Sequence, residues 1–244
     1  MKNIKLIIEF DGTNFCGSQV QVRGRTVQGE MEQAIETVTG QKLRIIGCSR
    51  TDSGVHGRNY VLNFKCATSI PPDRFLYPLN DVLPPDIRVK SSCEVPMDFH
   101  ARKDALRKTY SYTFRSGRVE FPLTSRYESL EKLDPSYDKM KEAAGRFLGT
   151  HDFKAFRSTG SSVQSTIRTI HHIDIRKTDG RFILTITGNG FLYNMVRIIA
   201  GTLIEIGAGL RSIDDIQGAF LTLERSKAGK VAPAKGLVLE SIEY

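Results

Sequence analysis

The chain has 244 residues, of which 40% are hydrophobic and 25% charged, and its formal net charge is +8 at pH 7. These values are typical of an ordinary soluble globular protein with one large domain or two small ones. The sequence contains no apolar run long enough for a membrane span, no signal-peptide core and no Cys-x-x-Cys pair of the kind that binds zinc. Its widely separated cysteines predict reduced thiols in the cytoplasm, and its positive charge favours a polyanionic partner.

Hydrophobic periodicity predicts the secondary structure of the first half. In chain order the expected elements are a strand at 4–10, a polar loop at 13–26, a helix from Thr26 to Gly40, strands at 42–46 and 60–64, a short helix at 73–82 and a strand at 87–95. The two strands at 42–46 and 60–64 enclose a glycine-rich polar loop. A loop held between strands is a place where rigid scaffolds carry reactive groups.

The second half repeats this order in outline. After a crossing segment at 99–104, the expected elements are a strand at 106–115, a charged irregular excursion at 116–134, a helix at 137–148, a loop with four serines at 150–166, strands at 167–177 and 181–187, helices at 191–206 and 213–223, and a strand at 237–242. The Asp179-Gly180 pair between two alternating segments is a strong hairpin signal.

The order strand, helix, strand, strand, helix, strand occurs twice and predicts an α+β architecture. We expect two similar halves, residues 1–104 and residues 105–244, each with a mainly antiparallel sheet and helices on one side. We further expect the two sheets to adjoin through their first strands and to form a central cleft, with the Asp52 loop in its wall.

Asp52 is the one carboxylate in the glycine-rich loop, and Arg50, His56 and Arg58 flank it. A carboxylate next to cations stays ionised at neutral pH, which suits a nucleophile or a base. The alternative is an aspartate that caps its own turn beside solvated arginines.

Arg197 stands in a segment that is otherwise apolar almost all round. An unpaired charge in such a place costs several kcal/mol, on the order of the penalty for burying an ion, so it needs an anion, and Asp52 is a natural partner. The alternative is a guanidinium at the helix edge that reaches water.

Tyr110 and Tyr112 lie on one face of a strand beside basic residues, where an aromatic ring can stack on a base or pack in the core. The sequence does not decide between them. The scattered histidines His100, His151 and the pair His171-His172 favour structural or surface roles over acid–base or metal chemistry.

The segment Arg50-Thr51-Asp52-Ser53-Gly54-Val55-His56 resembles the RTDxGVH signature of the tRNA pseudouridine synthase A family. Further segments resemble the family in the same order from start to end of the chain. They are 10–13 (FDGT), 26–30 (TVQGE), 99–102 (FHAR), 107–112 (RKTYSY), 147–153 (FLGTHDF), 190–197 (GFLYNMVR) and 233–237 (PAKGL). Ser18 stands where the family usually has tryptophan, and Asn59-Tyr60 replaces a usual Gly-Gln. These departures concern either RNA contact or core packing.

The resemblance implies the pseudouridine synthase fold and an enzyme that isomerises uridine to pseudouridine at positions 38, 39 and 40 of the tRNA anticodon stem-loop. By that resemblance Asp52 is the catalytic aspartate, Tyr110 packs on the target uracil, Arg197 pairs with the aspartate, Arg50 helps to hold the nucleotide out of its stack, and Leu237 lines the base pocket. It also implies a homodimer that needs no cofactor or metal. The expected cytoplasmic location follows from the sparse cysteines, and the reaction requires that the target base first flips out of its stem.

The reaction breaks the N1–C1′ bond, turns the uracil and joins C5 to C1′. Because it involves no redox change, these side chains suffice without a cofactor. A carboxylate can attack C1′ or remove a proton from C2′, and the sequence leaves both open. Two other classes of protein remain as alternatives. A non-catalytic RNA-binding module would explain the charge and the aromatics but lacks a clear RNP1 run, and a nucleoside hydrolase would use the aspartate but usually needs further acids or a metal.

Overall fold

The computed structural model describes residues 1–160 and 163–244. Two of the four serines in the expected 150–166 loop, at 161 and 162, lie outside the described residues. The chain divides into two compact units: unit 1 comprises Met1–Leu106 and Val238–Tyr244, and unit 2 comprises Arg107–Leu237. The expected division placed the last strand in the second half. In the structure Val238–Tyr244 belongs to unit 1, because Val238 and Leu239 pair with His56 and Gly57 there.

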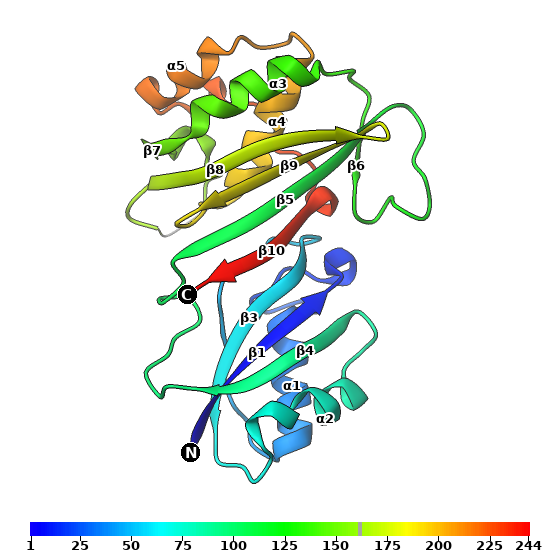
Figure 1. Cartoon of the computed structure of the whole chain (residues 1–244), viewed down its shortest axis with the longest axis vertical. Helices are drawn as coiled ribbons and strands as arrows, with labels where there is room; N and C mark the ends of the chain where they lie inside the picture. Colours follow the sequence, from blue (N-terminus) through cyan, green and yellow to red (C-terminus); the bar gives the residue numbers. More distant parts are fainter. Residues whose placement is uncertain (161–162) are drawn as a thin grey trace. The chain divides into compact units, whose positions relative to one another are not determined.

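Unit 1 is a mixed sheet with helices on one face (Figure 1). Its strands are β1 (Lys2–Phe10), β2 (Ile46–Gly47), β3 (His56–Cys66), β4 (Ile87–Val95) and β10 (Leu237–Glu243), and its α-helices are α1 (Val27–Thr39) and α2 (Leu76–Val82). Strand β1 is antiparallel to both β3 and β4, β10 is parallel to β3, and the short β2 pairs with β3. Since β1 has a partner on each edge, it is an inner strand. The expectation that sheets adjoin through β1 is therefore wrong.

The local sequence explains the start and end of α1. The hydroxyl of Thr26 accepts a hydrogen bond from Gly29 N–H at 3.2 Å, and Gly40 ends the helix at φ +70°. The strand expected at 42–46 is shorter, because Ile45 N–H donates to the Glu32 carboxylate on α1 at 3.2 Å instead of to a neighbouring strand. Only Ile46–Gly47 remains as β2.

Unit 2 has a sheet in the order β5-β9-β8-β7, and every neighbouring pair in that order is antiparallel. Its strands are β5 (Arg107–Ser116), β6 (Ser129–Glu131), β7 (Gly149–Asp152), β8 (Ile167–Thr178) and β9 (Arg181–Gly188), and its α-helices are α3 (Tyr137–Ala144), α4 (Met195–Gly207) and α5 (Asp214–Thr222). Strand β6 runs parallel to β5. The helices lie on one side of the sheet (Figure 1).

Turn residues set the bounds of the elements in unit 2. The β8–β9 hairpin forms as expected, with Asp179 at φ +49° and Gly180 at φ +72°. Helix α4 starts at Met195 instead of 191, because Asn194 adopts the left-handed conformation at φ +60°. Helix α3 ends at Ala144, followed by a 3-10 turn, and the first three residues of the expected 150–166 loop belong to β7.

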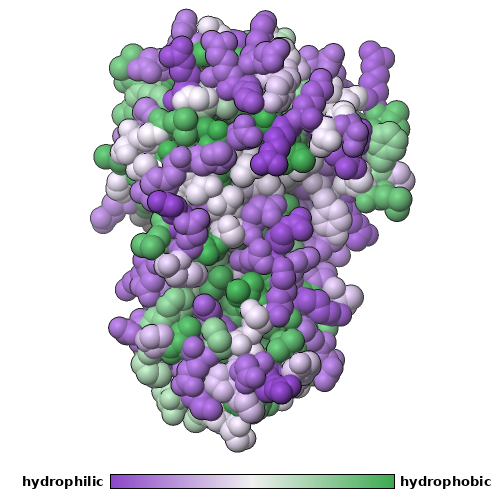
Figure 2. Space-filling model, viewed as in Figure 1, coloured by the Kyte–Doolittle hydropathy of each residue, from purple (hydrophilic) through white to green (hydrophobic). Residues whose placement is uncertain are grey.

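The α+β class is confirmed, with mainly antiparallel strands and helices packed on one side within each unit. Among the described residues, none of the helices combines the length and the apolar character that crossing a bilayer requires. The β5–β6 loop (residues 117–128) exposes large apolar side chains, and Figure 2 shows hydrophobic colour on the right-hand edge of unit 2. These side chains are Val119, Phe121, Leu123 and Tyr127.

Candidate active site

The loop between β2 and β3 carries Asp52, which is half-buried, and Arg50, which is exposed. Val55 N–H donates to Asp52 O at 3.2 Å and closes a turn, and Gly54 inside that turn has φ +78°. A positive φ favours glycine, so Gly54 permits the turn that follows Asp52. The backbone of the motif thus determines where Asp52 stands.

The segment before α1 supports this loop from one side. Ser53 Oγ donates to Phe15 O at 3.1 Å, and Gly54 N–H donates to the same oxygen at 3.3 Å. Gly17 has φ +99°, and a Cβ there would lie 2.7 Å from Thr51 O. The two backbones approach so closely that only glycine fits at this position.

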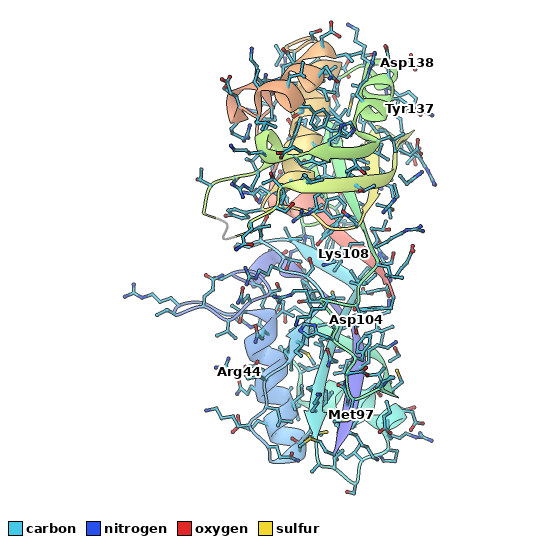
Figure 3. The ribbon with its side chains drawn as sticks, turned by 90° about the vertical axis from the view of Figure 1, so that its left-hand side faces the viewer. Arg44, Met97, Asp104, Lys108, Tyr137 and Asp138 are labelled. Atoms are coloured by element: carbon cyan, nitrogen blue, oxygen red, sulfur yellow. The ribbon has the colours of Figure 1, made fainter. Side chains whose placement is uncertain are left out.

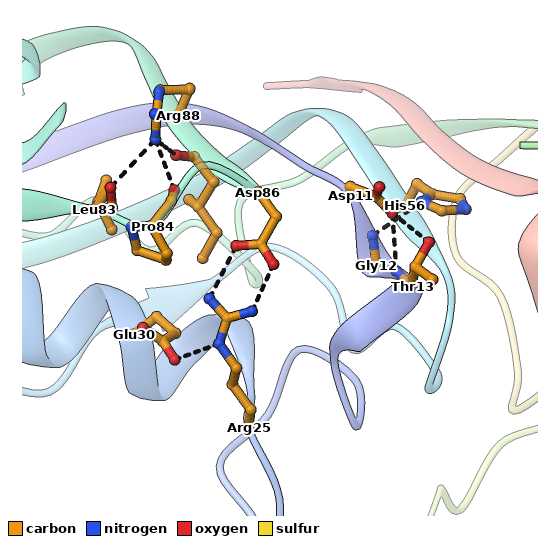
Figure 4. A network of polar contacts seen from close by, with 11 residues as sticks. Asp11, Gly12, Thr13, Arg25, Glu30, His56, Leu83, Pro84, Asp86 and Arg88 are labelled. Atoms are coloured by element: carbon orange, nitrogen blue, oxygen red, sulfur yellow. Dashed lines mark hydrogen bonds and ion pairs between the residues drawn. The ribbon is translucent and has the colours of Figure 1, made fainter. Parts of the chain in front are cut away.

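The tip of the same segment is exposed. Val22 is 103% exposed, and Figure 3 shows the loop before α1 projecting from the strands of unit 1. Its base is held by Arg25, which forms a bidentate pair with Asp86 at 2.5 and 2.9 Å and a bond to Glu30 at 2.6 Å (Figure 4). The Asp86 carboxylate raises the pKa of Arg25 above its usual value. The guanidinium also lies 4.3 Å from the centre of the Phe15 ring.

His56 lies beneath the loop and is buried. Gly12 N–H donates to His56 Nδ1 at 2.9 Å, while Asp11 Oδ1 lies 3.2 Å from the same nitrogen (Figure 4). The two contacts call for different proton positions on Nδ1. Asp11 Oδ1 also accepts from Thr13 N–H at 2.9 Å.

Unit 2 carries both candidate tyrosines on β5. Tyr112 is fully buried, its Oη lies 2.8 Å from Ser129 Oγ, and burial raises its pKa. Tyr110 is 5% exposed, and its ring packs edge to face with Phe191 at 5.2 Å. Since Tyr112 directs its hydroxyl into the interior of unit 2, Tyr110 is the better candidate for contact with a base.

Arg197 is half-buried on α4, and its guanidinium is held in a defined orientation. Arg197 Nε donates to Ala232 O at 2.7 Å, and Nη1 donates to Asn194 Oδ1 at 2.8 Å. Asn194 in turn donates to Ser158 Oγ at 2.9 Å. These acceptors favour a fixed guanidinium over one that simply reaches for water.

Leu237 is the last residue of the segment 232–237, whose first residue, Ala232, accepts the hydrogen bond from Arg197. Leu237 is 6% exposed and follows the 3-10 turn Ala234–Gly236. A Cβ on Gly236 would lie 2.5 Å from Thr113 O, so the segment passes closely over β5. Unit 2 therefore connects Arg197, Leu237 and the tyrosine strand β5 through one short stretch of chain.

Comparison with known proteins decides the family. The model of the tRNA pseudouridine synthase family matches residues 6–104 and 143–244. The chain belongs to the tRNA pseudouridine synthase family. Proteins named tRNA pseudouridine synthase A are similar over the full length of both chains: 50% identical in Clostridium acetobutylicum, 48% in Acetivibrio thermocellus and 47% in Clostridium botulinum. The expected class, an isomerase that acts on uridine in tRNA, is confirmed by this membership.

The match to the tRNA pseudouridine synthase family includes Arg50, Asp52, Arg197 and Leu237, whereas Tyr110 lies between the two matched ranges. The proposed role of Tyr110 therefore depends on its own motif and on its place on β5. Arg50 and Asp52 belong to unit 1. The other expected site residues, Tyr110, Arg197 and Leu237, belong to unit 2.

The histidines outside the motif have local structural contacts or lie at the surface. His151 stacks on Phe220 with ring centres 4.4 Å apart, and His100 Nδ1 lies 3.2 Å from the amide nitrogens of Arg102 and Lys103, which donate to it. His171 and its neighbour are exposed. In residues 1–160 and 163–244, no cluster of three His, Cys, Asp or Glu side chains has a metal-binding arrangement.

Sequence reasoning did not identify Ser18 and Tyr60 as supports of the Asp52 loop. Both side chains are buried, and both form hydrogen bonds to Ser49 in that loop. The one signal in the sequence was that each stands at a departure from the usual family pattern.

Proposed function

We propose that this tRNA pseudouridine synthase converts uridine to pseudouridine at positions 38, 39 and 40 of the anticodon stem-loop. The observation that carries the proposal is the Asp52 loop, in which the family motif forms a turn fixed by Gly54, Phe15 and Ser18. A fixed loop places one carboxylate against a substrate sugar, which is what this isomerisation requires.

Asp52 is the proposed catalytic residue. In one route its carboxylate attacks C1′ as the N1–C1′ bond breaks, and the uracil then turns and its C5 displaces the carboxylate. In the other route the carboxylate removes the C2′ proton as the N1–C1′ bond breaks, which leaves a glycal, and it returns that proton to C2′ when C5 bonds to C1′. In both routes C5 gains the bond to C1′ and loses its proton, and N1 gains a proton, so the product has the mass of the substrate.

The remaining site residues position the base and the carboxylate. Arg197, oriented by Ala232 and Asn194, is the proposed partner of Asp52. Tyr110 stacks on the uracil and keeps the freed base in place while it turns, and Leu237 supplies an apolar wall of the base pocket. Arg50, which is exposed beside Asp52, helps to hold the nucleotide out of its stack.

The proposed partner is the anticodon arm of tRNA, bound by a cytoplasmic homodimer without cofactor or metal. Extruding a paired base costs a few kcal/mol, about the energy of unstacking, and contacts to phosphate offset that cost. The formal net charge of +8 supports such contacts.

Product analysis on an unmodified tRNA transcript tests the proposal. We expect an isomer of unchanged mass at positions 38–40, whereas a nucleoside hydrolase would release free uracil and a plain RNA-binding module would release nothing. Modification confined to another arm of the tRNA would contradict the proposed position. A steep fall of tRNA affinity with rising salt is expected from phosphate contacts.

A further inference from the structure

Two buried hydroxyl groups meet one carbonyl oxygen in the loop that carries Asp52. Tyr60, on β3, donates from Oη to Ser49 O at 2.6 Å. Ser18, in the segment before α1, donates from Oγ to the same oxygen at 3.4 Å. Tyr60 is 4% and Ser18 3% exposed. A carbonyl oxygen has two lone pairs and accepts both bonds.

Ser18 also holds the residue next to Asp52. Its Oγ accepts from Thr51 N–H at 2.8 Å, and its own N–H donates to Thr51 O at 3.1 Å. Ser18 O accepts from Gln28 N–H at 2.9 Å, which ties Ser18 to the first turn of α1. The loop is thus fixed to α1 immediately before the catalytic carboxylate.

The ring of Tyr60 is fixed independently of its hydroxyl. The ring lies close against Gly47, where a Cβ would come within 3.0 Å of Tyr60 Cζ and 3.2 Å of Cε1. It also packs edge to face with Phe10 at 5.6 Å. A Tyr60→Phe variant therefore removes one hydrogen bond while the ring keeps its packing.

We propose that Ser18 and Tyr60 are a pair of positioning residues for Asp52, which act together through the Ser49 carbonyl. We call this arrangement the hydroxyl brace. It rests on the function proposed above, because it takes Asp52 as the catalytic carboxylate. Both side chains stand at departures from the usual family pattern, and their burial assigns these departures to support of the loop and not to RNA contact.

The brace acts on the chemical step. It sets the position of the loop before substrate binds, and a misplacement of about 1 Å costs on the order of 10²-fold in rate. Loss of a brace hydroxyl therefore lowers kcat and leaves KM for tRNA nearly unchanged. Because each loss leaves the Ser49 carbonyl with one donor and loosens the same loop, the second loss adds less than the first.

The experiment compares Tyr60→Phe, Ser18→Ala and the double variant of the full chain on an unmodified tRNA transcript. We expect each single variant to lose about tenfold in kcat with KM within about twofold, and the double variant to lose about thirtyfold instead of a hundredfold. Tyr137→Phe is the matched control, because Tyr137 Oη donates to a backbone carbonyl, Ile175 O, at 3.1 Å in unit 2. Its kcat should equal that of the wild type. Thermal unfolding and tRNA affinity are measured on the same preparations.

Single variants with wild-type kcat, beside an inactive Asp52→Asn, would overturn the brace and leave the proposed function intact. Pseudouridine formation by Asp52→Asn would instead contradict the proposed function. If the two losses in kcat multiply in the double variant, the two hydroxyls act separately and the proposed pairing is wrong. If only KM changes, the residues contact RNA and the proposal is also wrong. If Ser18→Ala does not fold, Ser18→Cys, with its weaker donor and acceptor, replaces it, and an unchanged kcat there overturns the proposal.

Discussion

The two units fix their polar loops by different forces. In unit 1 the Asp52 loop is held by backbone amides, glycines and the uncharged hydroxyls of Ser18 and Tyr60. In unit 2 the β5–β6 loop is held by charge. Arg115 Nε donates to Glu128 Oε1 at 3.2 Å, and Arg181 Nε lies 2.7 Å from Glu128 Oε2. Neutral bonds hold the same geometry at any ionic strength, whereas ion pairs depend on pH and salt.

The ion pairs around Glu128 shift the pKa of its carboxyl group. Burial by itself would raise the pKa of Glu128, but hydrogen bonds from Thr124 and Arg115 and the charges of Arg181 and Arg115 outweigh burial, so its pKa is lowered. Two further ion pairs of unit 2 are Lys230–Glu131 and Lys235–Glu120. The comparison shows two ways of supporting a polar loop, uncharged hydrogen bonds around Asp52 in unit 1 and ion pairs around Glu128 in unit 2.

Replacing Asp52 tests the proposed catalytic carboxylate of the unit 1 loop. Asp52→Asn keeps the shape of the side chain, and we expect kcat to fall by a factor of about a thousand or more. Thermal unfolding and tRNA affinity should stay at wild-type values. Quantifying pseudouridine in tRNA after incubation with the purified variant checks this, and substantial product would contradict the role of Asp52.

Replacing Arg197 tests whether one charge of unit 2 serves the carboxylate of unit 1. We expect Arg197→Ala to lower kcat by about a hundredfold, and Arg197→Lys to restore little, because lysine lacks the planar fork. In urea unfolding, Asp52→Ala combined with Arg197→Ala should be more stable than Arg197→Ala alone, since no unpaired carboxylate remains. Additive effects in this double-mutant cycle would show that the two side chains do not interact.

Replacing Glu128 breaks the ionic support in unit 2. We expect Glu128→Gln to lower the free energy of unfolding by about 2 kcal/mol at pH 7, less than for a fully buried pair because Arg181 is partly exposed. A lowered folded-state pKa means that wild-type stability from this group is present above the usual glutamate pKa and is lost as pH falls through the folded value.

The difference between wild type and Glu128→Gln should therefore shrink in acid. Urea unfolding at pH 7 and at a strongly acidic pH measures it. Glu120→Gln is the matched control, because the Glu120 side chain is 50% exposed in its pair with Lys235, and its effect should stay below about 0.5 kcal/mol. An equal difference at both pH values would contradict the ionic interpretation.

Replacing Thr51 tests a neutral group of unit 1 that lies outside the hydroxyl brace. Thr51 Oγ1 is buried, and no hydrogen-bond partner for it occurs in the described part of the chain. Thr51→Val removes this hydroxyl at nearly constant volume, so stability should stay the same or rise by about 1 kcal/mol, with kcat within about twofold. Chemical denaturation and the tRNA assay check both values. A large loss of kcat would mean that Thr51 Oγ1 gains a partner in the substrate complex.

Local patterns in the sequence determined most elements and the position of the loop that carries the proposed catalytic residue. Thr26 and Gly40 delimit α1, and Asp179-Gly180 forms the turn of the β8–β9 hairpin, because caps and tight turns depend on the residues within a few positions. The motif around Asp52 was recognisable for the same reason, since its glycines and polar groups follow one another in the chain.

Only the tertiary structure decided which elements pair and what supports the loop. Periodicity tells which face of a strand is buried but not which strand lies beside it, so the inner position of β1 and the return of β10 to unit 1 were not predictable. The same holds for Ser18 and Tyr60, which stand 42 positions apart in the printed chain and yet donate to one oxygen of Ser49. A hydrogen bond between distant segments depends on the fold that brings them within about 3 Å.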